Sequence, residues 1–432
     1  MLRIVETSML PVLTCPEPTE KMDRIAVKEV FAKAVKEWKG GSFALDLSNW
    51  IALKGTDCLR DAAEGILLAL YKPAKYSKKQ SEEPETVVEL IGLRGNEEAK
   101  EVIRETEHVV KGIVFARNMT NMPGNMLRPL DFAGKVAELV EQVPVEVEIL
   151  SRERLAELGM NAMLAVGDSS AYPPCLAILR YRGNPDTKEI TGLVGKGVTC
   201  DTGGYCLKNA GSMMGIRGDM AGGAAVAGAI YALAANGVKV NVTGLIPMCE
   251  NRISPGSYLP GDVITAYDGQ TIQIVNTDAE GRLMLGDAVA YAVRTESVSQ
   301  VVDIATLTGA AVGITAFGAA PCLAEGEAFY EEFLEGIGLS GERYLRLPIY
   351  PEYEKMIESE VADMKNSGGK FAGTITAGLF IRKFAAGRPW IHLDIAGTSW
   401  VEKPIYEFQA KGATGAGVTS MYYLCRRKGR SL

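Results

Sequence analysis

The sequence predicts a two-domain α/β fold with a central, mainly parallel or mixed sheet, and three observations support this prediction. The chain has 432 residues, more than a single hydrophobic core usually organises. From about residue 122 onward, short β-rich runs alternate with helical stretches, which is typical of a mainly parallel sheet covered by helices. A separate block, 1–95, comes before a long helical stretch at 96–121. We therefore expect an N-terminal α/β domain (1–95), a connecting helix (96–121) and a C-terminal α/β domain (122–432).

The N-terminal block contains two helical stretches, 22–38 and 58–70, and one strand-like run, 86–93. The segment 72–85, KPAKYSKKQSEEPE, is charged, contains proline and lacks a hydrophobic period, so we expect an exposed loop there. In the connecting helix, apolar residues recur at a spacing of three to four positions. Asn96, directly before two glutamates, suits the N-terminus of that helix.

The C-terminal block alternates between the two kinds of element. The expected strands are 145–150, 175–181, 190–194, 238–246, 263–266, 271–275, 300–304 and 390–395, and the expected helices include 221–235 and 283–293. Asp268-Gly269 separates two of the short strands, which predicts a hairpin.

Composition and charge exclude several classes of protein. A formal net charge of −7 and a pI near 5.3 argue against a general nucleic-acid or anionic-membrane binder. Eight cysteines without a regular framework indicate reduced thiols. Glu6 and Pro11 interrupt the N-terminal apolar run, so no secretory signal is evident. The uncharged stretches 220–238 and 309–324 are rich in glycine and alanine and marginally long for a membrane span, so we expect interior elements and a cytoplasmic protein.

The run NTDAEGR (276–282) places two carboxylates and a guanidinium within five positions. Neighbouring carboxylates repel one another unless a cation holds them together, and a divalent metal turns such a pair into a ligand set. In isolation this run is most often a solvated turn with a local ion pair. Further basic and acidic residues upstream, in VGKGVTCDTGGYCLK (194–208) and GIRGDM (215–220), favour the metal interpretation.

Charged and polar residues follow several of the expected strands, at the carboxyl ends where sites form in open α/β sheets. They are Lys196 and Asp201 after 190–194, Asp278 and Glu280 after 271–275, and Thr306 and Thr308 after 300–304. Asp219 lies instead at the start of a helix, where free backbone N–H groups favour a carboxylate. We expect these groups to converge on one site.

Glycines around Lys196 and Asp201 leave a phosphate site as an alternative, because glycine-rich loops after strands can cradle phosphates. However, GxxxxGK[ST] is absent here, and no GxGxxG opens a helix. Two carboxylates beside a phosphate would also repel it without a metal. We therefore favour a metal site over a nucleotide site.

Several spaced motifs together resemble the leucyl aminopeptidase family, which comprises cytosolic, hexameric, two-metal exopeptidases. The matching segments are NMPGNMLRP, VGKGVTCDTGGYCLK, RGDMAGGAAV, PGDVITAYDGQTIQIVNTDAEGRLMLGDA, DIATLTGA, ADMKNSGG, WIHLDIAGT and KGATGAGV, covering about 121–129 and 190–418. The resemblance implies an N-terminal domain like a macro domain, a catalytic C-terminal domain, peptide substrates and a homohexamer built as a dimer of trimers.

The resemblance also implies two divalent metal ions per subunit, zinc, manganese or both. Their implied ligands are Lys196, Asp201, Asp219, Asp278 and Glu280, with Asp201 and Glu280 bridging the two ions. A lysine ligand must be neutral, and adjacent cations lower its pKa. Only one histidine, His392, lies in the catalytic block, so an HExxH zinc site is excluded.

The implied reaction is removal of the first residue of a peptide by a hydroxide that bridges the two ions. Lys208 would donate to the carbonyl oxygen in the transition state. Arg282 would hold a bicarbonate that carries a proton to the leaving amine. The bicarbonate site would comprise Ala279, Gly281, Arg282 and Leu307.

The implied pocket for the first residue departs from the family pattern. It would comprise Ile216, Thr306, Gly309, Ala396 and Ser399. Family members commonly carry methionine at 216 and some carry it at 399, so the preference for leucine stays open. Trp400 is expected to be a core residue. The alternative is that its side chain fills part of the first-residue pocket.

Two cysteines also depart from the family pattern. Cys200 and Cys206 flank Asp201, so a thiolate ligand and a redox-sensitive site are alternatives to buried, inert thiols. We hypothesise that oxidants would inactivate the enzyme through Cys206, two residues before Lys208.

Three other functions remain alternatives to a general aminopeptidase. The first is a narrow dipeptidase, for example one acting on cysteinylglycine. The second is a hexameric DNA-binding or regulatory protein, which the acidic charge disfavours. The third is an inactive scaffold, which the complete ligand set disfavours.

Overall fold

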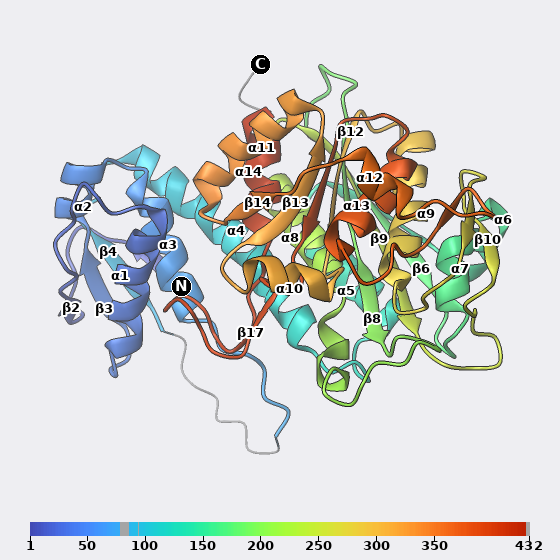
Figure 1. The fold of residues 1–432 in the computed structure, drawn as a ribbon. Helices are drawn as coiled ribbons and strands as arrows, with labels where there is room; N and C mark the ends of the chain where they lie inside the picture. Colours follow the sequence, from blue (N-terminus) through green and yellow to red (C-terminus); the bar gives the residue numbers. More distant parts are fainter. Residues whose placement is uncertain (78–85, 94, 429–432) are drawn as a thin grey trace.

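The computed structural model describes residues 1–77, 86–93 and 95–428 (Figure 1). The predicted loop 72–85 lies partly outside the described residues. Its described part, 72–77, has no helix or strand and is mostly exposed, as predicted.

The N-terminal unit is a parallel four-stranded sheet with helices packed on it. The strands are β1 (Leu2–Ile4), β2 (Val12–Leu13), β3 (Phe43–Asp46) and β4 (Val88–Ile91), in the order β1-β4-β3-β2, and the helices are α1 (Arg24–Glu37), α2 (Ser48–Lys54) and α3 (Cys58–Ala69). Phe31, Trp50 and Leu90 belong to a hydrophobic core of this unit. The predicted helices and the strand 86–93 are confirmed, whereas β1 to β3 and α2 are too short for a hydrophobic period to reveal.

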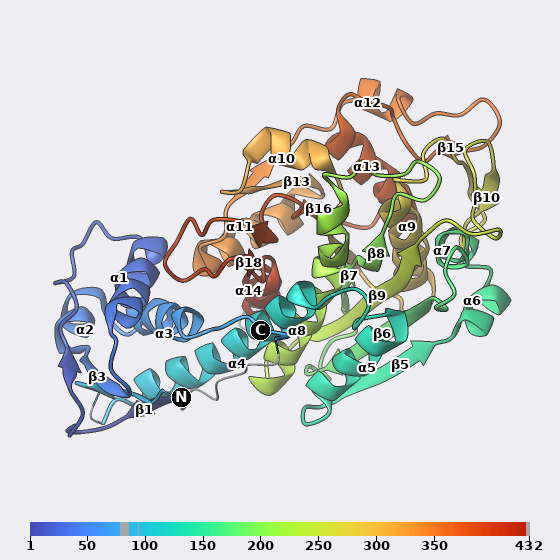
Figure 2. The same ribbon diagram turned by 90° about the horizontal axis from the view of Figure 1, so that it is seen from below.

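A long helix, α4 (Glu97–Asn121), runs from the N-terminal unit onto the C-terminal unit (Figure 2). The Asn96 side chain caps it by accepting a hydrogen bond from the Ala99 backbone N–H. Gly112 of α4 meets Gly228 of α8 (Ala221–Ala235) so closely that a Cβ atom on Gly112 would lie 2.4 Å from the Gly228 carbonyl oxygen. The helix is therefore packed into the C-terminal unit over its second half.

The C-terminal unit is built on a nine-stranded mixed sheet in the order β14-β13-β16-β12-β7-β9-β6-β5, with β8 also paired to β9. Its strands are β5 (Val145–Leu150), β6 (Cys175–Arg182), β7 (Thr191–Gly195), β8 (Gly197–Asp201), β9 (Asn241–Asn251), β12 (Gln300–Ala305), β13 (Ala320–Glu325), β14 (Tyr344–Arg346) and β16 (Trp390–Asp394). The central strands β16, β12, β7 and β9 are parallel, and β5, β6 and β13 are antiparallel to their inner neighbours. The predicted α/β class with a mainly parallel or mixed sheet is confirmed.

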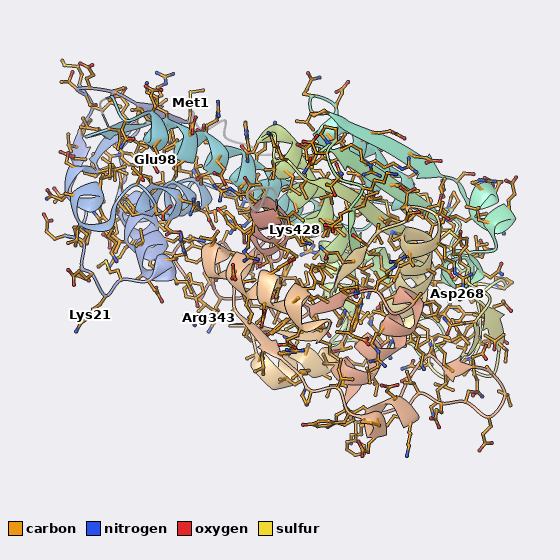
Figure 3. The ribbon with its side chains drawn as sticks, turned by 90° about the horizontal axis from the view of Figure 1, so that it is seen from above. Met1, Lys21, Glu98, Asp268, Arg343 and Lys428 are labelled. Atoms are coloured by element: carbon orange, nitrogen blue, oxygen red, sulfur yellow. The ribbon has the colours of Figure 1, made fainter. Side chains whose placement is uncertain are left out.

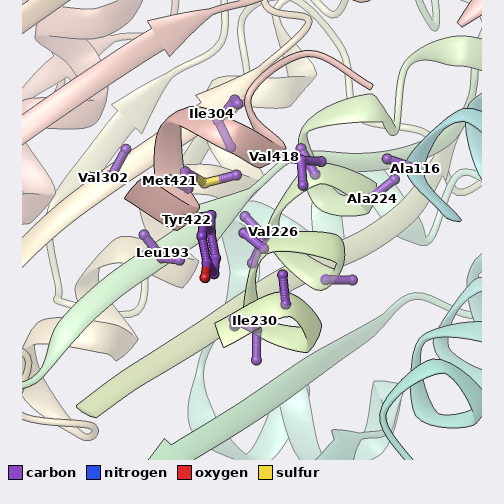
Figure 4. Close-up of a cluster of buried hydrophobic side chains, with 14 of the residues drawn as sticks. Ala116, Leu193, Ala224, Val226, Ile230, Val302, Ile304, Val418, Met421 and Tyr422 are labelled. Carbon is purple, nitrogen blue, oxygen red and sulfur yellow. The ribbon is translucent and has the colours of Figure 1, made fainter. Parts of the chain in front are cut away.

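Helices cover both faces of this sheet. They are α5 (Pro129–Val140), α6 (Arg152–Leu158), α7 (Asn161–Gly167), α8 (Ala221–Ala235), α9 (Glu280–Arg294), α10 (Gly309–Thr315), α11 (Glu327–Ser340), α12 (Pro351–Lys355), α13 (Gly373–Arg382) and α14 (Val418–Lys428), with 3-10 helices η1 (Met213–Gly218) and η2 (Lys383–Ala385). On one face, Val226 of α8 and Met421 of α14 pack with Val302 of β12 (Figure 4). On the other face, α7, α9 and α13 enclose a second core.

The helical stretch Met213–Ala235 is the one described segment that is long and apolar enough to cross a membrane. Its apolar window is 83% buried inside the protein, between α4, α14 and the sheet. It is therefore accounted for as a core helix, as the glycine- and alanine-rich sequence predicts.

The predicted hairpin at Asp268-Gly269 is present, because β10 (Val263–Thr265) and β11 (Thr271–Gln273) pair antiparallel. Asp268 lies at the end of the molecule remote from Met1 and Lys21 (Figure 3). These strands form a separate three-stranded sheet with β15 (Met364–Lys365). The expectation that β11 ends at the same sheet edge as β7 and β12 is therefore wrong. A final short pair joins β17 (Trp400–Val401) to β18 (Gly412–Ala413).

Candidate active site

The site begins at Lys196, the single residue between strands β7 and β8. The Lys196 backbone N–H donates to the Ile304 carbonyl of β12 at 3.1 Å, so the lysine is fixed where two parallel strands end. Its side chain is only 3% exposed. Gly281 makes room for it, because a Cβ atom at Gly281 would lie 2.6 Å from Lys196 Cε.

Three carboxylates lie together beside Lys196, from two different parts of the chain. Asp201 is the last residue of β8, and Asp278 and Glu280 come from the turn that opens α9. One oxygen atom from each lies within 4.8 Å of the other two, a spacing suited to a shared cation. Gly203 allows this approach, because it adopts φ +87° and a Cβ atom there would lie 2.9 Å from Asp278 Oδ1.

The two lysines join these carboxylates and Asp219 into one cluster. Lys196 Nζ lies 2.7 Å from Asp219 Oδ2 and 2.7 Å from Glu280 Oε1. Lys208 Nζ lies 2.6 Å from Asp201 Oδ2 and also donates to Asp278. We call Lys196, Asp201, Lys208, Asp219, Asp278 and Glu280 the carboxylate–lysine cluster. The structure thus brings together all five predicted metal ligands and the predicted catalytic lysine.

The protein's own charges set the protonation of this cluster. Burial lowers the pKa of Lys196, but Asp219, Glu280 and Asp201 raise it by more, so the pKa of this lysine lies above its usual value. Burial raises the pKa of Asp219 to about 8, against the opposing effect of Lys196. Burial and Asp201 raise the pKa of Asp278 to about 6. Neutral Lys196 therefore requires added positive charge nearby, which divalent ions would bring.

The donor set fits hard or borderline divalent ions. Four carboxylates and one amine are oxygen and nitrogen donors of the kind that manganese and zinc accept. The buried Asp219 Oδ2 atom has no hydrogen-bond partner within the described residues, although Lys196 lies 2.7 Å away. The Asp278 side chain is 33% exposed, so the cluster is open to solvent on that side. The cluster is therefore accessible to a metal ion and to a substrate from the side of Asp278.

Arg282 lies on the first turn of α9, two residues after Glu280 of the cluster, and its side chain is buried. Its NH1 group donates to the Asn366 carbonyl at 2.9 Å, while its Nε atom has no partner within the described residues. Burial lowers the pKa of Arg282 to about 10, so the guanidinium stays charged near neutral pH. Of the other predicted bicarbonate residues, Leu307 already donates its N–H to Asp394 at 3.1 Å, and Ala279 and Gly281 are buried beside Glu280.

The predicted first-residue pocket is only partly assembled around the cluster. Thr306 Oγ1 donates to Asp219 Oδ1 at 2.7 Å, and Lys196 Nζ donates to the Thr306 carbonyl, so this residue lines the site. Ile216 and Ala396 are half-buried, Gly309 is exposed at the start of α10, and Ser399 is 5% exposed.

Trp400 is not the core residue that the sequence suggested. It is partly exposed, and the Arg217 guanidinium lies over its ring at 5.4 Å. That contact connects the η1 segment, which carries Ile216, to the segment of Ser399.

Sequence reasoning missed the residues that hold these loops in place. Asp394, at the end of β16, accepts hydrogen bonds from the Leu307 and Ala396 backbone N–H groups and from Thr308 Oγ1. Asn251 Nδ2 donates to Asp201 Oδ1 at 3.0 Å. Asp394 lies within WIHLDIAGT, but a fully buried acidic residue inside an apolar run carries no local sign of its partners.

The two cysteines differ in their surroundings. Cys200 is buried, and burial raises the pKa of its thiol to about 11, which disfavours a thiolate ligand. Cys206 is half-buried, and its Sγ atom accepts a hydrogen bond from the Thr277 N–H at 3.4 Å. The redox hypothesis for Cys206 stays a prediction.

Comparisons with known proteins agree with this site. Residues 114–422 match the sequence model of the cytosol aminopeptidase family, catalytic domain. A probable cytosol aminopeptidase of Clostridium perfringens is 40% identical over 410 residues, covering 93% of this chain and 83% of the relative. One of Clostridium tetani is 38% identical over 416 residues, covering 94% and 85%. Among solved structures, the bottromycin maturation enzyme BotP in complex with Mn superposes with a TM-score of 0.88 at 31% identity, covering 96% of this chain and 89% of BotP.

Proposed function

This chain belongs to the cytosol aminopeptidase family and is a metal-dependent aminopeptidase, and we propose how its side chains remove the first residue of a peptide. Divalent metal ions are its cofactors. The proposed ligands of two such ions are the side chains of Lys196, Asp201, Asp219, Asp278 and Glu280. When bound, zinc or manganese ions at these ligands would polarise the scissile carbonyl and lower the pKa of water.

Asp219 is proposed to select the free amino terminus. Its Oδ2 atom is buried, and the Lys196 ammonium lies 2.7 Å from it. If Lys196 is neutral and bound to a metal ion, this oxygen can accept from a substrate ammonium or amine instead. Thr306 occupies its other oxygen, which fixes the carboxylate in one orientation. A peptide with a blocked amine could not make this contact, and this restricts cleavage to the first residue.

Lys208 is proposed to stabilise the negative charge that develops on the carbonyl oxygen. Burial lowers the pKa of Lys208, but Asp201 and Glu280 raise it by more, so the pKa lies above its usual value and the group stays an ammonium. Its side chain is 21% exposed at the mouth of the cluster, where a substrate can reach it. Such a fixed donor contributes most when the charge it meets appears only in the transition state.

Arg282 is proposed to hold a bicarbonate ion, with Ala279, Gly281 and Leu307 around it. The support is that its buried Nε–H donor has no partner within the described part of the chain. A bound bicarbonate would supply a base near neutral pH that can move a proton.

The first residue of the substrate is proposed to lie against Ile216, Thr306, Gly309, Ala396 and Ser399. Ser399 is small and buried, and Ile216 is β-branched, so the pocket has a shape different from one lined by methionines. A screen of first residues measures the resulting preference.

The single observation that carries the proposal is the convergence of four carboxylates and a buried lysine. Its test is metal analysis and peptidase activity of the wild type beside Asp278→Ala. The wild type with Mn²⁺ should hydrolyse unblocked leucyl or methionyl substrates and lose activity with a chelator, and the variant should retain fewer ions. Failure of the wild type to cleave any unblocked substrate would contradict the proposal.

The assembly and location are also proposed. We propose a homohexamer of two trimers, a cytoplasmic location and an N-terminal domain like a macro domain, with domains at 1–95, 96–121 and 122–432. Membership of the family supports this proposal. The parallel sheet of the N-terminal unit and the separate hydrophobic core of that unit support it as well. Light scattering coupled to size exclusion should give the mass of six chains of 46.4 kDa.

A further inference from the structure

A second pocket opens beside the carboxylate–lysine cluster, on the side of Asp278. It has a volume of about 700 Å³ and is lined by Cys206, Val275, Asn276, Lys365, Ser367, Gly368, Gly369 and Lys370. Asn276 is two residues before Asp278, and Cys206 is two residues before Lys208. The pocket therefore lies next to Asp278 and Lys208 of the carboxylate–lysine cluster.

The wall of this pocket is fixed to the active site by Asn366. Asn366 Oδ1 accepts hydrogen bonds from the backbone N–H groups of Val275 and Asn276, and its Nδ2 group donates to the Asn276 carbonyl. Its own carbonyl accepts from Arg282. Lys365 and Ser367 flank Asn366 in the chain, so both are held at a set position relative to the cluster.

The pocket borders the cluster at Asp278, because its lining residue Asn276 lies two residues before that carboxylate. Asp219, bonded to Thr306, marks the end where the substrate amine is proposed to bind. Asp278, with Asn276, marks the side of the cluster that borders this pocket. A peptide that presents its first residue to the Thr306 side would extend its departing part toward Lys365 and Lys370.

The chemistry of this pocket is cationic. Lys365 is half-buried and Lys370 exposed, and no ion pair involves either lysine in the described part of the chain. Acidic groups nearby are otherwise engaged: Asp363 accepts from Thr271, and Asp278 accepts from Lys208. The hydroxyl of Ser367 and the backbone of two glycines add small polar groups around the ammonium groups. Such a pocket suits a carboxylate.

We propose that Lys365 and Lys370 bind a carboxylate on the departing part of the peptide, so that the preferred substrates carry one there. This inference rests on the proposed aminopeptidase function and extends it to a substrate class. The carboxylate can come from the C-terminus of a dipeptide or from an acidic side chain at the second position. Partly exposed charge pairs of this kind predict a preference of roughly two- to fivefold in kcat/KM.

The test compares four substrates that differ only in carboxylate placement: Leu-Gly, Leu-Gly-amide, Leu-Asp-amide and Leu-Asn-amide. The first pair isolates the C-terminal carboxylate, and the second pair isolates the acidic side chain. At least one pair should show the preference in the Mn²⁺-loaded wild type, and high salt should reduce it. The pair that shows it identifies the source.

The Lys365→Met/Lys370→Met double variant should bring the ratio within that pair close to one. The matched control is Lys188→Met, an exposed lysine on the loop before β7, which should keep the wild-type ratio. Equal rates within both pairs for the wild type, or a ratio that survives in the double variant, would overturn the inference while leaving the aminopeptidase proposal intact. Absence of hydrolysis of all four substrates, and of unblocked substrates with any other first residue, would instead refute the proposed reaction and this inference with it.

Discussion

The Nζ atom of Lys196 lies 2.7 Å from Oε1 of Glu280, with both side chains 3% exposed. One residue comes from the junction of β7 and β8 and the other from the first turn of α9. A buried amine between Glu280 and Asp219 is expensive to desolvate, so its position indicates a role beyond stability.

Replacing Lys196 with methionine should affect both stability and metal content. Without the ammonium, the buried carboxylates of Asp219 and Glu280 lose their partner, which costs about 3–5 kcal/mol in the chelator-treated protein. In Mn²⁺ the variant should bind fewer ions per chain. Thermal unfolding with chelator measures the first effect, and elemental analysis measures the second. A variant with wild-type metal content would remove Lys196 from the ligand set, and Lys188→Met is the matched control.

Replacing Gly281 with alanine should lower activity without unfolding the protein. The added methyl would lie 2.6 Å from Lys196 Cε, so the lysine must move away from Glu280. We expect kcat/KM to fall by at least about tenfold, because the reaction rate falls steeply when a group of the active site is displaced from its reactive position. Gly134→Ala, a helical glycine with nothing within 4 Å of its added Cβ, is the control and should keep full activity. Equal activity of the two variants would show that this close packing does not position Lys196.

Replacing Asp394 with asparagine should mainly raise KM. Asp394 holds the Leu307 and Ala396 backbone segments, which border the proposed first-residue pocket. The amide keeps one acceptor oxygen, and its NH₂ group must face either the backbone N–H groups or the Thr308 hydroxyl, so the loop contacts change at a cost of up to about 1–3 kcal/mol. Steady-state kinetics with substrates of different first residues should show altered selectivity as well. A fall in kcat alone, with KM and selectivity unchanged, would contradict this positioning role.

Asp287 should make the stability of the protein depend on pH. Burial raises its pKa from 3.8 to about 7, although backbone N–H groups of Tyr267 and Met163 oppose the shift. Because the folded state binds this proton more tightly, the free energy of unfolding falls as pH rises from about 4 to about 7. This group should therefore contribute stability on acidification through this range, and melting temperatures of the wild type and a variant without this carboxyl, both in chelator, measure that contribution.

The control for that prediction is the difference between variants. Asp287→Asn should show a weaker rise in melting temperature between about pH 7 and about pH 5.5, because it has no carboxyl proton to gain. The exposed Asp186→Asn variant should behave like the wild type. If Asp287→Asn keeps the wild-type pH dependence, this carboxyl group does not titrate in the window.

The fold class could be predicted because hydrophobic periods are local. The strands of the central sheet and helices such as 96–121 carry enough regular positions to be recognised in the sequence. Strands β1 to β3, of two to four residues, do not. Sheet membership is also not local, and β11 was therefore assigned to the wrong sheet: its partners are β10 and β15, and β15 lies about ninety residues further along the chain.

The site could be predicted where charged residues break apolar runs, as Lys196, Asp201 and Glu280 do. Supporting residues could not, because Asn366 and Asp394 act through backbone groups that lie far away in sequence. The prediction that Trp400 is a core residue was likewise wrong, because a lone tryptophan in the sequence gives no sign of its contact with Arg217. The pocket lined by Lys365 and Lys370 could not be predicted for the same reason, because these lysines and Asn276 come together only in the folded chain.

The most direct test of the central claim is anomalous diffraction at the manganese edge from crystals grown with Mn²⁺. We predict two anomalous peaks inside the carboxylate–lysine cluster, within coordination distance of Asp201 and Glu280. Lys196, Asp219 and Asp278 should complete their ligands. A map with no peak there, or with manganese held only by residues outside this cluster, would contradict the account.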